Sequence, residues 1–261
     1  MKLSICAIFR DESKYLREWV QFHALQGCEK FFLYQNRSVD DWQSVLQPYI
    51  DSGLVEVTDW PYPPPCQIEA YNHYIDSHIG MSEWCAFIDI DEFLFSSKYN
   101  IVTEALASFP AHWQSIAVNW MCFGSSGEQE WKDIPVIERF TWRKSADIPS
   151  NHYVKPIVRM DKHFTIYDPH CANVPTFTPS GRPTSGPHSI PHEYDILRIN
   201  HYGSKSRQEW VTRQQFGKPC GGGPSPEECY NEIQGWDVDD REIQRFLPEL
   251  KERLSVCKTL S

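Results

Sequence analysis

The chain has 261 residues and a mass of 30.5 kDa, a size that suits one large domain. Apolar residues make up 41% and charged residues 23%, which excludes global disorder and permits a folded core. The charges sum to 25 − 35 = −10, which disfavours proteins that bind nucleic acid through a basic surface. The aromatic share of 14%, with 10 tryptophans, suits a large core and also a site where flat rings stack on a carbohydrate or nucleoside.

Nine cysteines are spread along the chain without any CxxC pair. This distribution predicts buried, reduced thiols rather than a disulfide framework or a cysteine-based zinc site. The first nine residues predict a strand and not a signal peptide, and no apolar run reaches the roughly 18–20 residues of a membrane-spanning helix. We therefore expect a soluble, cytoplasmic protein with no transmembrane segment.

The first hundred residues alternate strand and helix signals. Short apolar runs predict buried strands at 3–9, 30–34, 55–59 and 84–88. Helices are predicted from a cap at Asp11 or Ser13 to about Gln26, near 42–52 and around 68–78. This alternation predicts a parallel sheet covered by helices, on which ligands bind beyond the carboxyl ends of the strands.

The second half has fewer helix signals. Strands are predicted at 115–121, 136–142, 153–159 and 197–202, joined by loops. Prolines recur every four residues from Pro175 to Pro191, so 171–193 is expected to be a mobile surface loop or lid and not a packed element. Three glycines at 221–223 predict a break, and residues from 225 onward predict an amphipathic helical cap.

The clearest chemical signal is the acidic run DIDE at 89–92, directly after the strand predicted at 84–88. Carboxylates at i and i+2 where a strand ends can both reach one hard cation and leave positions for water and a diphosphate. As a bare pattern, the same pair can also be a solvated surface feature. Its position at a strand exit favours the metal site, with Asp89 and Asp91 as candidates.

Two further signals stand at strand exits. In the segment NHYGSKS at 200–206, His201 offers a third metal ligand and Lys205 a partner for phosphate, although a histidine can equally be buried for packing. After the first strand come Arg10, Asp11 and Glu12, where a nucleotide-binding fold places its ligand. The glycine-rich motifs of NAD and P-loop proteins do not occur there, which argues against both chemistries.

Several motifs in order resemble glycosyltransferase family 92, part of the GT-A superfamily of nucleotide-sugar transferases. The segments are FRDESKYLREWVQFHALQGCEKFFLYQNRSVDDW, QIEAYNHY, WCAFIDIDEFL, NWMCFGSSG, KPIVRM and INHYGSKSRQEW, and the resemblance spans about residues 3–217. The family usually reads Lys-Asn-Glu where this chain has RDE at 10–12, and Asp-Asn where it has QN at 35–36. Glu128 stands where relatives often carry a histidine.

The resemblance implies an α/β, GT-A-like fold: a mixed, mainly parallel sheet flanked by helices, with a C-terminal helical cap. It implies one domain over 1–261, with a nucleotide-binding half at 1–95, an acceptor and metal half at 96–217 and the cap at 225–261. The implied activity is a metal-dependent, inverting transfer of a sugar, galactose by preference, from a UDP-sugar to a glycan acceptor. Contact with a membrane would be peripheral, through the acceptor.

The resemblance also implies roles for single residues. Asp89 and Asp91 are expected to bind Mn²⁺ or Mg²⁺, with Asp91 the direct ligand and Asp89 nearer the ribose or a bound water, and His201 completes the metal site. The strand ends around the uridine are expected to carry Arg10, Glu12, Asn36 and Gln67. The basic side chains expected to meet the diphosphate are Lys155, Arg159 and Lys205. Breaking the sugar–phosphate bond puts negative charge on the leaving diphosphate, and a cation with such side chains stabilises that charge.

An inverting transfer also needs a carboxylate that takes the proton of the attacking hydroxyl. The metal carboxylates lie on the wrong side for this role, so the loop after the strand at 115–121 is the expected source. Glu128 is the first choice there, with Glu130 and Asp133 nearby. Two other functions stay open: a metal-dependent phosphohydrolase or nucleotidyltransferase, and a non-catalytic carbohydrate-binding protein whose tryptophans are stacking platforms.

Overall fold

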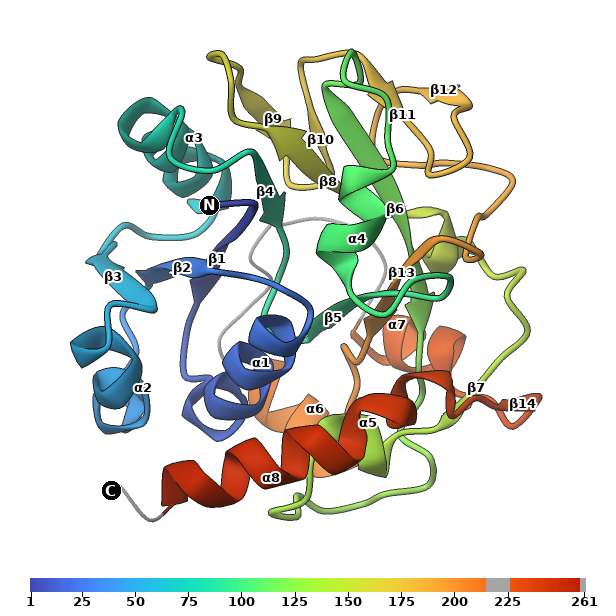
Figure 1. The fold of residues 1–261 in the computed structure, drawn as a ribbon. Coiled ribbons are helices and arrows are strands. Elements are labelled where there is room, and N and C mark those ends of the chain that lie inside the picture. Colours follow the sequence, from blue (N-terminus) through green and yellow to red (C-terminus); the bar gives the residue numbers. More distant parts are fainter. Residues whose placement is uncertain (215–225, 259–261) are drawn as a thin grey trace.

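The computed structural model describes residues 1–214 and 226–258, and it shows a central sheet flanked by helices (Figure 1). The amino-terminal half alternates strands and helices as predicted. Its elements are β1 (Leu3–Phe9), α1 (Ser13–Leu25), β2 (Lys30–Gln35), α2 (Trp42–Asp51), β3 (Val55–Asp59), α3 (Gln67–His78) and β4 (Trp84–Phe87). The cap of α1 differs from the prediction, because Glu12 is the N-cap residue and Asp11 has a positive φ of 54°.

The second half adds shorter elements, several of which the sequence did not predict. They are β5 (Glu92–Ser96), α4 (Val102–Ala107), β6 (Ser115–Cys122), α5 (Val136–Arg139), β7 (Trp142–Arg143), the 3₁₀ helix η1 (Pro149–His152), β8 (Val154–Arg159), β9 (Ile166–Asp168), β10 (Cys171–Ala172), β11 (Thr176–Phe177), β12 (Pro183–Thr184) and β13 (Leu197–His201). The carboxyl-terminal elements are α6 (Arg207–Gln214), α7 (Pro226–Ile233), β14 (Val238–Asp239), the 3₁₀ helix η2 (Glu242–Phe246) and α8 (Leu247–Lys258).

The described strands of the main sheet run in the order β12-β11-β6-β8-β4-β1-β2-β3, while β13 pairs with both β5 and β6. β1 pairs in parallel with β2 and β4, and β2 in parallel with β3. β8 lies between β4 and β6 and is antiparallel to both. The predicted mixed sheet with flanking helices is therefore confirmed.

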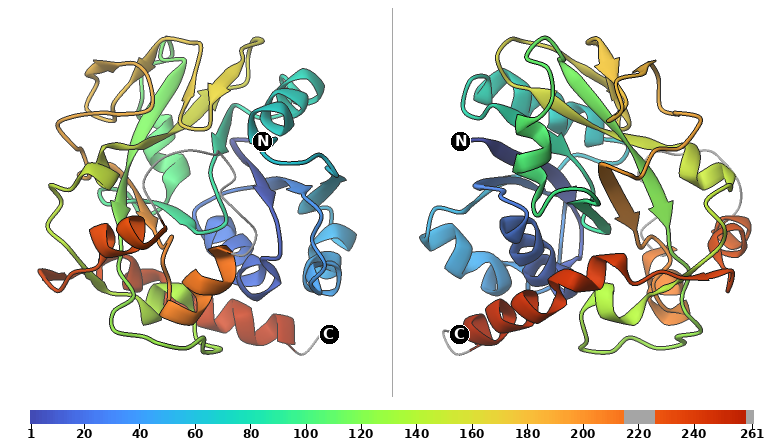
Figure 2. Two further views of the ribbon diagram at one scale, coloured as in Figure 1. Left: turned by 180° about the vertical axis from the view of Figure 1, so that it is seen from behind. Right: turned by 45° about the vertical axis from the view of Figure 1, so that its right-hand side comes forward.

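Helices cover both faces of the sheet (Figures 1 and 2). Alternate side chains of β1 enter different clusters: Ile5 and Ala7 pack with α1, α2 and α8, whereas Cys6 packs with α3. α8 lies against α1, so the last described helix completes the core on that side. This alternation is what a strand buried on both faces requires.

The prediction of a strand at 136–142 is wrong. The chain forms the short helix α5 over Val136–Arg139 instead. The buried carboxylate of Glu18 accepts the backbone N–H groups of Val136 at 2.7 Å and Ile137 at 3.2 Å, and these are donors that a helix leaves unsatisfied at its first turn. A partner 118 residues away in the sequence leaves no local pattern.

The prediction that 171–193 is not a packed element is also wrong in part. β11 pairs in parallel with β6 and antiparallel with β12, so this segment adds a small edge to the main sheet. Thr178 and Ser189 are buried, which a loop lying free on the surface would not produce.

The helical cap expected from residue 225 onward is found as α7, η2 and α8 within 226–258. The glycines at 221–223 lie outside the described residues. Seven of the cysteines in the described part are free thiols, and six of these seven are buried. A search of the described helices finds none long and apolar enough to span a membrane.

Candidate functional site

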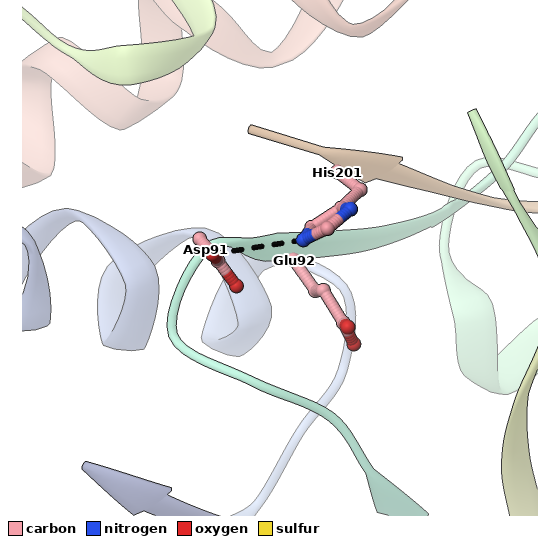
Figure 3. A group of neighbouring side chains, drawn as sticks. All are labelled: Asp91, Glu92 and His201. Carbon is pink, nitrogen blue, oxygen red and sulfur yellow. Dashed lines mark ion pairs between the residues drawn. The ribbon is translucent and has the colours of Figure 1, made fainter. Parts of the chain in front are cut away.

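Two carboxylates and an imidazole meet where β4 ends and β5 begins (Figure 3). β13 runs antiparallel to β5 in a register that places His201 opposite Glu92. His201 Nε2 lies 3.6 Å from Asp91 Oδ2, and one ligand atom from each of Asp91, Glu92 and His201 falls within 4.8 Å of the others. The predicted meeting of Asp91 and His201 is therefore found, at a sequence distance of 110 residues.

This group fits a divalent cation. Asp91 is 2% exposed and Glu92 is fully buried. Among the described residues, the buried Asp91 Oδ1 has no hydrogen-bond partner, which is costly unless something else binds it. Glu92 Oε1 makes no hydrogen bond either and has only the Lys155 ammonium at 3.5 Å. Carboxylate oxygens are the ligands that Mn²⁺ and Mg²⁺ prefer, and imidazole is accepted by the softer divalent ions. The residues that would hold the cation are thus Asp91, Glu92 and His201.

Arg213, at the end of α6, is paired with Asp91 in this structure. Its Nη1 contacts Asp91 Oδ2 and donates to the carbonyl of Gly203 at 3.1 Å. Burial raises the pKa of Asp91, but the positive charge of Arg213, with His201 beside it, outweighs burial and holds that pKa well below its usual range. For Glu92 burial dominates, and its pKa lies well above the usual range.

Asp89 lies outside the group of three. Its Oδ2 accepts from Lys155 Nζ at 2.8 Å, and its Oδ1 accepts from Gln67 Nε2 at 2.7 Å. The structure therefore separates the two aspartates: Asp91 lies with His201, and Asp89 lies toward α3. A direct bond from Asp89 to the cation stays a prediction.

Lys155 was predicted to meet the diphosphate, and the structure corrects this. Its side chain has no exposed surface, and its ammonium lies 2.8 Å from Asp89 and 3.5 Å from Glu92. A fully enclosed side chain cannot touch a ligand without rearrangement of its neighbours. Lys155 instead supplies a permanent positive charge beneath the acidic run.

Arg159 was also predicted to meet the diphosphate, and it lies at the wrong edge of the sheet. β8 is antiparallel to β4, so Arg159 pairs with Trp84 at the start of β4, whereas the site lies beyond the end of β4. Its guanidinium binds Glu83 at 2.8 Å and donates to the carbonyl of Trp113 at 2.9 Å. The resemblance that suggested Arg159 carried no information on the direction of this strand.

The residues predicted around the uridine do line one pocket together. Its lining includes Arg10, Glu12, Asn36, Gln67, Asp89, Asp91 and Arg213. Asn36 is almost buried, and its amide donates to the carbonyls of Trp60 at 2.7 Å and Tyr62 at 2.8 Å. It thus fixes the start of the proline-rich turn that borders the pocket. Burial raises the pKa of Glu12 against the opposing charges of Lys205 and Arg213.

Lys205 lines a neighbouring pocket that shares Arg10, Glu12 and Arg213 with the first. Its Nζ lies 4.2 Å from the centre of the Tyr15 ring, and its backbone φ is +48°. Arg213 borders both pockets, so its side chain stands between the pocket of Asn36 and Gln67 and the pocket of Lys205.

A buried ion pair holds α6, and therefore Arg213, in place. Arg139 donates to Glu209 Oε2 at 2.8 Å, and the two side chains are 2% and 6% exposed. Tyr15 donates to the same carboxylate at 2.6 Å. Because Glu209 stands one helical turn before Arg213, these bonds fix the direction from which Arg213 reaches Asp91.

Glu128, the predicted base, is not part of either pocket lining. Its carboxylate lies 2.6 Å from Lys132 Nζ, and its backbone carbonyl accepts from Arg207 at 3.2 Å. The loop that carries Glu128 therefore packs against the start of α6, and Glu128 itself lines neither pocket. The role of Glu128 stays a prediction.

The sequence matches the profile of glycosyltransferase family 92 over residues 2–243. The chain belongs to this family. A family 92 protein of Ricinus communis is 28% identical over 226 residues, covering 82% of this chain and 37% of that protein. One of Oryza sativa subsp. japonica is 31% identical over 162 residues, covering 61% of this chain and 27% of that protein. The matched part of the chain thus spans 37% of the first relative and 27% of the second.

Solved structures give a more distant likeness. The crystal structure of Staphylococcus aureus TarS 1–349 in complex with UDP-GlcNAc matches 97% of this chain and 72% of its own, with 13% identity and a TM-score of 0.46. A mannosyltransferase of Pyrobaculum calidifontis in complex with GDP-Man and Mn²⁺ matches 45% of this chain at 11% identity and a TM-score of 0.34.

Two residues of this family 92 site were missed from the sequence. Glu92 stands next to the predicted pair, and the signal that could have found it is the strand β5, which begins at that residue. Arg213 lies on the mostly polar helix α6 and gave no local signal. Only the packing of α6 brings its guanidinium to Asp91.

Proposed function

We propose that this family 92 chain is a metal-dependent, inverting glycosyltransferase that moves a sugar from a UDP-sugar to a glycan acceptor, with galactose the first sugar to test. The observation that carries the proposal is the cluster of Asp91, Glu92 and His201 beside the pocket that contains Asn36 and Gln67. A cation site that adjoins a pocket of polar strand ends suits a nucleoside diphosphate.

When bound, the cation would supply charge stabilisation for the departing diphosphate. The chain's own residues would do the rest. Arg10, Asn36 and Gln67 line the position proposed for the nucleoside, and Arg213 and Lys205 bring positive charge to its phosphate side. The enclosed Lys155 holds Asp89 in place by its 2.8 Å ion pair.

An inverting transfer further requires a carboxylate that removes the acceptor's proton from the side opposite the diphosphate. Glu128 remains the proposed base, which requires its 2.6 Å pair with Lys132 to open when an acceptor binds. We further propose the division into a nucleotide-binding half, an acceptor half and a helical cap within one domain.

The deciding experiment is calorimetric titration with UDP, GDP and ADP, each with and without Mn²⁺. We expect UDP to bind best, and only with the metal present. His201→Ala should raise the Mn²⁺ concentration needed for half-maximal UDP binding. His163→Ala is the matched control, because His163 also pairs with a carboxylate, Asp76 at 2.8 Å, but on the exposed surface.

Product analysis then separates the alternatives. Transfer of the sugar to a glycan, identified by product mass, supports the proposal. Release of phosphate or nucleoside monophosphate would identify a phosphohydrolase or nucleotidyltransferase. Glycan binding that needs neither UDP nor Mn²⁺ would identify a carbohydrate-binding protein and overturn the proposal.

A further inference from the structure

A cluster of aromatic rings begins at His201 and leads away from the nucleoside pocket. The Trp120 ring lies 4.1 Å from that of His201, centre to centre, at an angle of 30°. Tyr153 lies 5.3 Å and His170 5.0 Å from Trp120. His188 follows in an edge-to-face contact, 4.4 Å from Tyr153. We call Trp120, Tyr153, His170 and His188 the ring platform.

The ring platform reaches solvent, unlike the aromatic clusters of the core. Trp120, Tyr153 and His170 are half-buried, and His188 is exposed. By contrast, Trp19, Phe22 and Phe93, which form a comparable cluster on the other side of β5, are fully buried. A set of rings that runs from the half-buried metal-ligand candidate His201 to the surface is more than core filling.

The rings of the platform are flat and polar at their edges. Burial, with the nearby charge of Lys155, lowers the pKa of His170 to about 4, so this ring is neutral at physiological pH. The indole N–H of Trp120 is buried and finds no acceptor among the described residues. Flat neutral rings contact the C–H face of a pyranose, and an unused N–H can donate to one of its hydroxyls.

The order of the strands places the platform on the sugar side of the site. The nucleoside pocket is lined from the ends of β1 and β2, the acidic run follows β4, and the platform stands on β6 and just before β8. Across the sheet, β2, β1, β4, β8 and β6 follow one another in that order. A nucleotide sugar that lies with its diphosphate at the acidic run therefore directs its sugar toward the platform.

We propose that the ring platform binds a pyranose ring of the glycan acceptor. The inference rests on the proposed function and names the surface that receives the second substrate. The donor's sugar must lie next to the diphosphate, at His201. Tyr153 and His188 stand one and two rings farther out than Trp120, where an acceptor arriving from solvent is the ligand they can reach.

The test is saturation-transfer NMR with methyl β-D-galactopyranoside and methyl β-D-glucopyranoside, added to the full chain in the presence of UDP and Mn²⁺. We expect C–H protons of one sugar face to receive saturation. Tyr153→Ala should raise the dissociation constant of the probe on the order of tenfold. His188→Ala should raise it on the order of threefold, whereas Tyr153→Phe should retain binding because the ring is kept.

His112→Ala is the matched control. His112 is also an exposed histidine in edge-to-face contact with an aromatic ring, that of Phe177, but next to the start of β6 and not its site end. Unchanged probe binding in His112→Ala, together with the losses above, supports the proposal. Calorimetry with UDP is run on every variant, so that a failure of the nucleotide site is seen separately.

Three results would overturn the inference while UDP still binds. The first is that neither glycoside binds the wild-type chain. The second is that probe binding survives both Tyr153→Ala and His188→Ala. The third is that Tyr153→Ala weakens UDP-galactose relative to UDP but leaves the glycosides unaffected, which would assign the platform to the donor's sugar. If the wild-type chain does not bind UDP, the proposed function itself is overturned.

Discussion

Replacing Arg213 by glutamine should have opposite effects on two ligands of the same site. Arg213 is paired with Asp91, the carboxylate that a cation would use, and it also borders the nucleoside pocket. Arg213→Gln removes the positive charge and keeps a polar planar group. We expect Mn²⁺ to bind more tightly, because it no longer competes with the guanidinium, and UDP to bind more weakly, because a cation facing its phosphates is gone.

The size of both effects follows from exposure. The Arg213 side chain is 38% exposed, while Asp91 is 2% exposed. Solvent screens the ion pair between Arg213 and Asp91, because one partner is partly exposed. The free energy of this pair therefore lies nearer the ~1 kcal/mol of surface ion pairs than the 3–5 kcal/mol of enclosed ones. We therefore expect Mn²⁺ affinity to rise about tenfold and UDP affinity, measured at saturating Mn²⁺, to fall about tenfold.

Electron paramagnetic resonance of free Mn²⁺ measures the first effect and calorimetry the second. Arg207→Gln is the control, since Arg207 lies on the same helix, is 37% exposed and pairs with Glu227 instead. An unchanged Mn²⁺ affinity in Arg213→Gln would refute the idea that Mn²⁺ and the guanidinium compete for Asp91. Equal changes of Mn²⁺ affinity in Arg213→Gln and Arg207→Gln would show only a general effect of removing a positive charge.

Three further predictions concern single side chains. Asp91→Asn should abolish transfer and leave the melting temperature within a few degrees of wild type, since a neutral amide is a poor ligand for a hard cation but keeps the volume; near-normal turnover would contradict it. Glu128→Gln should lower the transfer rate on the order of 10²–10⁴ with UDP binding unchanged, and a retained rate would place the base elsewhere. Burial lowers the pKa of His23 to about 3, and its neutral ring bridges the carbonyl of Trp19 and the N–H of Leu94. Folding therefore opposes protonation of this ring, so the stability it contributes is complete above pH 6.5 and is lost as the pH falls toward 3, by up to about 4 kcal/mol. Urea unfolding at pH 7, 5 and 4 should show a shallower loss in His23→Gln than in wild type.

The sequence predicted those parts of the site in which a residue directly follows a single recognisable strand. The acidic run after β4 and His201 at the end of β13 each follow a recognisable strand, and polar side chains at such ends converge. Arg10, Asn36 and Gln67, which the family resemblance placed around the uridine, line one pocket.

What sequence could not supply is the direction of each strand and the partner of each helix. Lys155 and Arg159 stand four residues apart on one strand, and only the antiparallel direction of β8 places the first at the site and the second at the far edge. The helix α5 depends on Glu18, whose carboxylate arrives from α1. The direction of β8 and the contact of Glu18 with α5 arise from tertiary structure, so the local sequence does not indicate them.

The two basic side chains at the acidic run differ in a way that bears on how a cation would enter. Lys155 is fully enclosed between the half-buried Asp89 and the buried Glu92, and it stays in place as the positive partner of both carboxylates. Arg213 pairs with Asp91 from a half-open position, where water can replace its contacts. The site thus holds one fixed and one exchangeable positive charge. A cation can take the place of Arg213 at Asp91 while Lys155 keeps the rest of the acidic run in place, and the released guanidinium remains at the edge of both pockets, where the phosphates of the proposed donor would lie.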